Sequence, residues 1–187
     1  MVVVGRPKKF SRESVLEKAL PVFWRCGFAD TSLHELEQAT GVNKSGLYSE
    51  FKDKEDLFVQ SLQYYVDNLE LGRLLASEPL GWDNIERFLK ARPHNRQGLK
   101  GCFAVNSMRE CAILPQEAID IITQSRSKLK ELIAKNIGGE QPETEAYVLA
   151  ELVLTFFTGI YMEHNVSTSQ AGVARKGDEF MKLMRKV

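Results

Sequence analysis

Hydrophobic residues recur along this chain at three- and four-residue intervals almost throughout, and no segment of useful length alternates as a half-buried strand would. The pattern predicts an all-α fold of about nine helices. The expected ranges are 12–26, two short helices within 31–51, then 54–76, 82–91, 101–112, 115–138, 142–165 and 169–185. Pro21 removes a backbone donor inside the first helix, so a kink is expected there.

Residues 31–51, TSLHELEQATGVNKSGLYSEF, carry the most specific local signals. Ser32 and Glu35 have the spacing of a capping box at a helix start. Gly41 permits the positive φ of a tight turn, and Asn43 can cap a second helix. Two short helices joined in this way form the unit that places its second helix in the major groove of DNA. An ordinary helical hairpin in a bundle is the alternative interpretation.

The outward positions of that second helix favour the DNA-binding interpretation. They are small, hydroxylic or cationic, which suits close approach to phosphates and base edges. These positions are Lys44, Ser45, Gly46, Tyr48 and Ser49. Leu47 and Phe51 recur four residues apart on the opposite side and are expected to point inward.

The formal charge of the chain is balanced, with 25 Lys and Arg against 25 Asp and Glu. A protein dedicated to nucleic acid is usually basic overall, so any DNA contact here must come from a local patch. One such patch is GRPKKF over 5–10, which contains Arg6, Lys8 and Lys9 and no acidic residue. Directly before a helix-turn-helix, we interpret it as an arm that reaches phosphate or the minor groove. A solvated terminal tail is the alternative.

Residue types that carry catalysis are not gathered in a recognisable pattern. The three histidines are scattered, and the sequence has no Gly-rich phosphate loop, nucleophile elbow or metal-ligand spacing. We therefore expect no catalytic residue, metal or cofactor, and a helical enzyme with a vestigial DNA-binding unit is disfavoured. Three cysteines, an odd number, fit a reducing compartment. The apolar stretch 147–162, interrupted by Glu151, is short for a membrane span, so a cytoplasmic protein that enters no membrane is expected.

The helix expected over 142–165 is apolar on nearly all sides, which indicates burial on all sides. In a chain of this size, one face can pack inside the subunit and the other against a second copy. The last helix adds apolar positions, among them Phe180, on an otherwise charged background. The two helices together predict a homodimer, and a monomer with a deeply buried central helix is the alternative. A dimer would present two recognition helices to a palindromic operator of double-stranded DNA.

The segment over 101–112 places Asn106 and Arg109 on one helical face near small and apolar residues. Inward polar groups of this kind suit a small-molecule effector pocket, while a structural polar pair is the alternative. An unpaired Arg109 would call for an anionic or carbonyl-rich ligand, and an Arg109 paired with a glutamate would favour a neutral one. The expected walls of the pocket are Leu62, Tyr65, Phe103, Phe156 and Tyr161.

Cys102 and Cys111 fall in the same segment and raise the alternative of a thiol-based redox sensor. On one helix they would lie about 13 Å apart along the axis, too far for a disulfide. A buried, inert thiol is therefore the expected state of each.

With these residues in view, the chain resembles the TetR family of bacterial transcriptional regulators over 11–58, in the stretches ALPVFWRCGFADTSL, ATGVNKSGLYSEF and KDKEDLF. The resemblance implies a DNA-binding domain over 1–52 and a helical domain over 53–187 that dimerises and binds a small ligand. It implies a ligand-responsive repressor, although activation, the operator and the effector are left open.

The resemblance also assigns DNA contacts. It places Ser32 and His34 of the first short helix near DNA, puts the recognition-helix contacts on the outward positions named above, and makes Lys54 a phosphate contact. Asn43, at the start of the recognition helix, completes the expected set. Glu50, where the family often has histidine, is not assigned a contact, because an acid near phosphate is unfavourable.

Overall fold

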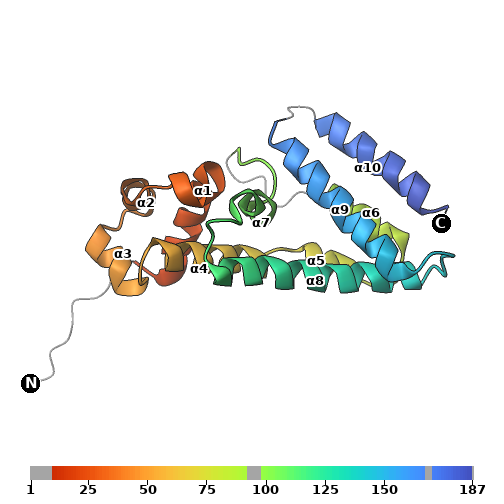
Figure 1. The fold of residues 1–187 in the computed structure, drawn as a ribbon, viewed down its shortest axis with the longest axis horizontal. Coiled ribbons are helices and arrows are strands. Elements are labelled where there is room, and N and C mark those ends of the chain that lie inside the picture. The colour runs from red at the N-terminus through yellow and green to blue at the C-terminus, as the bar shows by residue number, and fades with distance from the viewer. Residues whose placement is uncertain (1–9, 92–97, 167–169, 187) are drawn as a thin grey trace, which may run out of the picture.

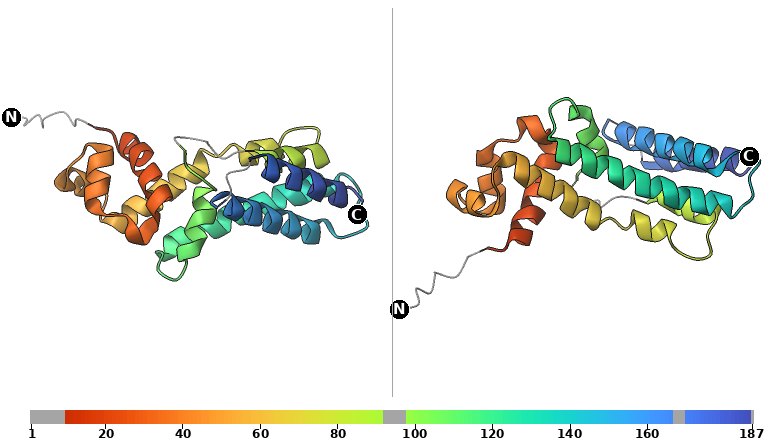
Figure 2. Two further views of the ribbon diagram at one scale, coloured as in Figure 1. Left: turned by 90° about the horizontal axis from the view of Figure 1, so that it is seen from above. Right: turned by 60° about the horizontal axis from the view of Figure 1, so that its bottom comes forward.

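The computed structural model describes residues 10–91, 98–166 and 170–186. These described residues form ten α-helices and one short 3₁₀ helix, with no strand among them. The molecule is elongated, with the first three helices at one end and α9 and α10 at the other (Figures 1 and 2). The all-α prediction is confirmed.

The N-terminal end contains α1 (Arg12–Asp30), α2 (Leu33–Thr40) and α3 (Lys44–Glu50). Ser11 accepts the backbone N–H of Ser14 at the start of α1, and Asp53 accepts that of Asp56 at the start of α4 (Lys54–Asp67). As Figure 1 shows, α4 runs from these helices into the rest of the molecule, and it packs against both α1 and α8. This helix therefore connects the N-terminal helices to the rest of the molecule.

The remainder is built around α8 (Gln116–Gly138), which lies beside α9 (Ala146–His164). The other elements are α5 (Leu71–Leu75), α6 (Trp82–Lys90), α7 (Phe103–Ser107), the 3₁₀ helix η1 (Met108–Glu110) and α10 (Gln170–Met184). A single cluster of buried side chains runs from Val15 of α1 to Met184 of α10. The two ends of the molecule thus share one core rather than meeting across a polar gap.

Three predicted helix boundaries were wrong. The helix expected over 54–76 is divided at Asn68, whose side-chain amide donates to the Tyr64 carbonyl at 2.8 Å and so competes with the helical ladder. The helix expected over 101–112 ends as α7 and η1, because the turn before Pro115 uses the Glu110 carbonyl to accept the N–H groups of residues 113 and 114. The helix expected from 142 begins at Ala146.

The first helix is interrupted at Gly27 rather than at Pro21. Gly27 is the one residue inside α1 with non-helical dihedral angles, φ 85° and ψ 176°. The chain then completes one more turn to Asp30 before α2 begins. The last turn of α1 is therefore offset from the body of that helix.

The helix α9 is long and apolar enough to cross a membrane by length and composition alone, as the core helix of a soluble protein also can be. Seven of its residues are buried in the fold, Ile160 and Tyr161 among them. Part of its apolar surface is thus used for packing within the molecule, while Leu152 remains 52% exposed.

Candidate DNA-binding surface and adjoining cavity

The start of α3 is fixed by two side chains that accept its free backbone N–H groups. Asn43 Oδ1 accepts from Gly46 N at 2.9 Å, and the Glu37 carboxylate accepts from Lys44 N. Leu47 and Phe51, each 1% exposed, anchor the opposite face in the core, as predicted. The helix is therefore held by both its cap and its inner face.

The outer face of α3 presents Lys44, Ser45, Tyr48 and Ser49, all exposed. The Lys44 ammonium lies 5.8 Å from the centre of the Tyr48 ring, so these two side chains share one side of the helix. Gly46 differs from the other four, because it is half-buried. A Cβ there would meet Val42 Cγ1 at 2.6 Å, so the glycine is required for packing under the helix.

On α2 the predicted capping box forms. Ser32 donates to Glu35 Oε2 through both its backbone N–H, at 2.9 Å, and its hydroxyl, at 2.8 Å, while Glu35 N donates back to Ser32 Oγ at 3.2 Å. These bonds hold the pKa of Glu35 below its usual value. His34, two residues after Ser32, is exposed and hydrogen-bonds Gln38 at 2.9 Å.

Lys54 has a second role that its sequence position did not suggest. Its ammonium donates to the carbonyls of Phe28 and Thr31, each at 3.0 Å, and to Ala29 at 3.4 Å. These carbonyls lie at the C-terminal end of α1, where helical carbonyls lack internal partners. Lys54 thus ties α4 to the last turn of α1. The predicted arm residues Arg6, Lys8 and Lys9 lie outside the described residues.

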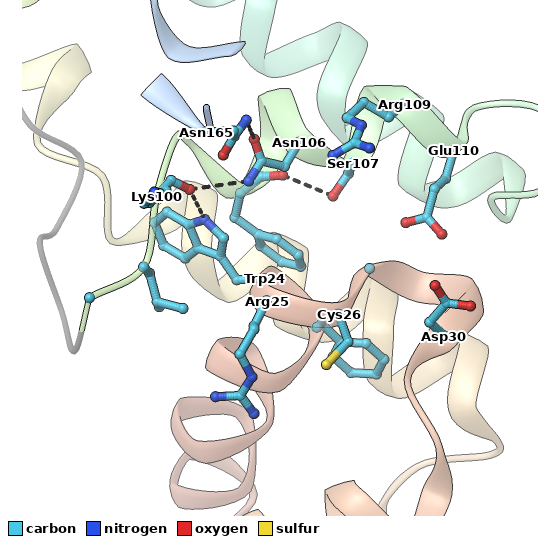
Figure 3. Close-up of a pocket in the computed structure, with 15 residues that line it drawn as sticks. Trp24, Arg25, Cys26, Asp30, Lys100, Asn106, Ser107, Arg109, Glu110 and Asn165 are labelled. Carbon is cyan, nitrogen blue, oxygen red and sulfur yellow. Dashed lines mark hydrogen bonds between the residues drawn. The ribbon is translucent and has the colours of Figure 1, made fainter. Parts of the chain in front are cut away.

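A cavity of about 560 Å³ lies between α1 and the α7–η1 segment (Figure 3). Trp24 forms part of its wall and donates its indole N–H to the Lys100 carbonyl at 2.7 Å. Asn106 Nδ2 donates to the same carbonyl at 3.2 Å, and Asn165 Nδ2 donates to Asn106 Oδ1 at 2.8 Å. These bonds connect α1, α7 and the end of α9 around one space.

The seven residues predicted to line an effector pocket do not meet in one cavity. Phe103, Asn106 and Arg109 line the space beside α1. Leu62 and Tyr65 of α4 are buried in the core, and Tyr161 of α9 is also buried and donates its hydroxyl to the Ala91 carbonyl. Phe156 stacks on Phe180 with ring centres 3.9 Å apart. Trp24 and Glu110 also line the cavity. Neither was predicted from the sequence, because the helical pattern does not show which distant segments meet.

The three cysteines have different environments. Cys102 is buried and accepts the Tyr65 hydroxyl at 3.2 Å, and burial raises the pKa of its thiol. The expectation of a buried thiol is confirmed for Cys102 and wrong for Cys111, which is exposed after η1. Over the described residues, no group of three His, Cys, Asp or Glu side chains is arranged to hold a metal.

An all-helical chain with a capped, exposed recognition helix defines a helix-turn-helix DNA-binding protein. Residues 15–60 match the model of bacterial regulatory proteins, tetR family. Over 97% of its length the chain is 30% identical to the HTH-type transcriptional repressor ComR of Escherichia coli strain K12, covering 87% of that protein. It is 25% identical to the repressor BdcR of the same strain, with 97% and 95% of the two chains covered. The chain therefore belongs to the TetR family, as a DNA-binding regulator of transcription of the repressor type.

Solved structures of the same family share the fold. The TetR family transcriptional regulator CifR, as a cysteine mutant complexed with 26bp double-strand operator DNA, matches with a TM-score of 0.81 at 20% identity, over 95% of this chain and 98% of that one. Reduced E. coli NemR matches with a TM-score of 0.78 at 19% identity, over 94% and 95% of the two chains. The N-terminal helix-turn-helix and the helical remainder are thus a known arrangement.

Proposed function

We propose that this chain is a homodimeric, cytoplasmic repressor that a small molecule releases from a palindromic operator. Residues 1–52 act as the DNA-binding domain, and residues 53–187 bind the effector and hold the dimer together. The observation that carries the proposal is the exposed face of α3, whose Lys44 and Tyr48 lie on one side of a helix fixed at its cap and in the core.

The proposed contacts divide into base-reading and phosphate-binding groups. Lys44, Ser45, Tyr48 and Ser49 are placed to enter the major groove, where lysine recognises guanine and tyrosine or serine contacts bases or phosphates. Ser32 and His34 at the start of α2, and Asn43 at the start of α3, are placed for the flanking backbone. Arg6, Lys8 and Lys9 would add phosphate or minor-groove contacts from the arm.

The proposed dimer contact is formed by α9 and α10. Both helices expose large apolar side chains, with Leu152 52% exposed and Leu183 65% exposed, close to the stacked pair of Phe156 and Phe180. Exposed apolar patches of this kind are typical of protein–protein contacts. A two-fold arrangement of this surface would set two α3 helices against successive major grooves.

The test of the proposed function is selection of bound fragments from random double-stranded DNA by the purified protein, followed by titration of the selected site. A palindromic consensus is expected. Lys44→Ala is expected to weaken specific binding by about 1–3 kcal/mol and to relax preference at one base position if it reads a base. If neither Lys44→Ala nor Tyr48→Ala changes operator affinity, α3 is not the recognition helix.

A further inference from the structure

The carboxylate of Glu110 reaches from η1 to the DNA-binding end of the molecule. Its Oε2 accepts from Phe28 N at 2.7 Å, and its Oε1 accepts from Ala29 N at 2.9 Å. The interruption of α1 at Gly27 leaves these two N–H groups without helical partners, and a Cβ on Gly27 would lie 2.7 Å from Glu110 Oε2. The last turn of α1 is therefore held by Glu110 on its N–H side and by Lys54 on its carbonyl side.

The residue next to Glu110 has no such partner. Arg109 lines the cavity, and its guanidinium makes neither a hydrogen bond nor an ion pair with any residue that the structure describes. The same holds for the ammonium of Lys100 on the opposite rim. Glu110, the nearest acid in the chain, is already bonded to two backbone N–H groups. Both cations are exposed to solvent. The lining contains three cations, Arg25, Lys100 and Arg109, and two acids, Asp30 and Glu110, so the cavity is positively charged overall.

The rest of the lining indicates the body of a ligand. The rings of Trp24 and Phe103 are stacked, with centres 6.0 Å apart and an angle of 23° between their planes. Asn106 and Ser107 supply neutral polar groups beside these rings (Figure 3). The volume, about 560 Å³, lies in the usual range for small-molecule sites. The two rings are buried, with Trp24 5% and Phe103 1% exposed, so they lie behind a largely polar lining. A cavity with more cations than acids beside two aromatic rings suits a compact organic anion with a planar body.

We propose that this cavity, between α1 and the α7–η1 segment, binds a small aromatic carboxylate with Arg109 as its charged anchor, and that Glu110 transmits its occupancy to the DNA-binding helices. The transmission, but not the binding, rests on the repressor function proposed above. Arg109 and Glu110 are consecutive residues of η1, so drawing Arg109 toward a ligand shifts the carboxylate that holds Phe28 and Ala29. A ligand that binds better to the shifted arrangement lowers operator affinity, because only differential affinity moves such an equilibrium.

The test uses one of the two tryptophans as the reporter. Trp82→Phe removes the tryptophan at the start of α6 and leaves Trp24 in the cavity wall. Benzoate is titrated into this variant while Trp24 fluorescence is followed, and benzamide, which has the same shape without the charge, is titrated in parallel. Saturable binding of benzoate is expected, with weaker binding of benzamide. Arg109→Gln is expected to weaken benzoate by about tenfold or more, as loss of a charge-assisted hydrogen bond does.

A matched control is Lys128→Gln, which removes one exposed cation from α8 outside the cavity and should leave benzoate affinity unchanged. The absence of saturable binding, equal affinity for benzamide, or equal weakening by Lys128→Gln would each overturn the site. Operator affinity is measured separately with and without saturating benzoate. A decrease supports transmission, and no change overturns transmission alone, because the fluorescence measurement requires no DNA and remains valid if the repressor function fails.

Discussion

Lys54 contacts Phe28 twice, once through the backbone and once through the side chain. Its ammonium donates to the Phe28 carbonyl at 3.0 Å and lies 4.8 Å from the centre of the Phe28 ring. A cation over an aromatic face and a carbonyl at a helix end are both favourable partners. The lysine expected to contact DNA phosphate therefore also connects α4 to the end of α1.

Replacing Lys54 with Met should separate these two roles. We expect a loss of about 1–3 kcal/mol in the free energy of unfolding, because carbonyls at the end of α1 lose their donor. The measurement is urea unfolding, with Lys52→Met as the control at an exposed neighbouring lysine. If Lys54 also contacts phosphate, as the family resemblance implies, the slope of log operator affinity against log salt should decrease in magnitude by about 0.9, and an unchanged slope would contradict that contact.

Gly27→Ala should be destabilising. The residue has φ 85° and ψ 176°, a region almost confined to glycine, and such a strained residue costs about 1–3 kcal/mol. Its Cβ would also press on the Glu110 carboxylate. Thermal unfolding is the measurement, and Gly72→Ala in α5, where a Cβ has ordinary space, should be neutral or stabilising. Equal effects of the two substitutions would show that the interruption of α1 is not a fixed feature.

The capping box gives folding stability a defined pH dependence. Hydrogen bonds from Ser32 lower the pKa of Glu35 below its usual value of 4.5. A group whose folded pKa is lowered contributes stability above its unfolded pKa and loses it as the pH falls through the folded pKa. Glu35→Gln should therefore be less stable than the parent at pH 7, and the difference should shrink on acidification below the unfolded pKa. In a Ser32→Ala background the pH-dependent difference should be reduced but not abolished, because the backbone N–H of residue 32 still donates to Glu35. An undiminished difference would show that the Ser32 hydroxyl does not contribute to it.

Phe180→Glu should disrupt the proposed dimer. The substitution removes the stack on Phe156 and places a charge on the α9–α10 face, where burial without a partner is costly. Sedimentation should show a monomer or an unfolded chain, with operator binding lost. Leu183→Asp, at a more exposed position, should produce the monomer without disturbing that stack. If both variants remain dimeric at low concentration, the interface lies elsewhere.

Alkylation should distinguish the cysteines and test the redox alternative. Iodoacetamide should modify Cys111 first in the native protein, because Cys111 is exposed and Cys102 is buried with a raised thiol pKa. Peptide mapping after timed labelling provides the measurement, and labelling in denaturant should modify all three cysteines. Rapid native labelling of Cys102 would support a thiol sensor at that position.

Local signals along the sequence predicted the DNA-binding end well. Ser32 and Asn43 cap the helices that they were expected to cap, because a cap depends on residues only two or three positions away. Helix breaks were harder to predict. Asn68 divides the long fourth helix by bonding to its own chain, and asparagine at a helix surface does not always do so.

The cavity could not be predicted from the helical pattern, because its walls come from distant parts of the chain. Trp24 and Lys100 are joined by a hydrogen bond across 76 residues, and Glu110 reaches back 82 residues to Phe28. Periodicity shows which face of a helix is inward but not which other helix it meets. Leu62 and Tyr65 were expected as walls of an effector pocket, but they pack in the core and line no wall of this cavity.

The close approach of Gly46 to Val42 also limits which positions of α3 can be varied in protein engineering. A Cβ at position 46 would lie 2.6 Å from Val42 Cγ1, so any side chain there would displace α3 from its packed position. A combinatorial library built to recognise new operators on this scaffold should therefore randomise 44, 45, 48 and 49 and keep glycine at 46. Altered specificity would then come from new side chains on an unmoved helix, which makes each selected change interpretable base by base.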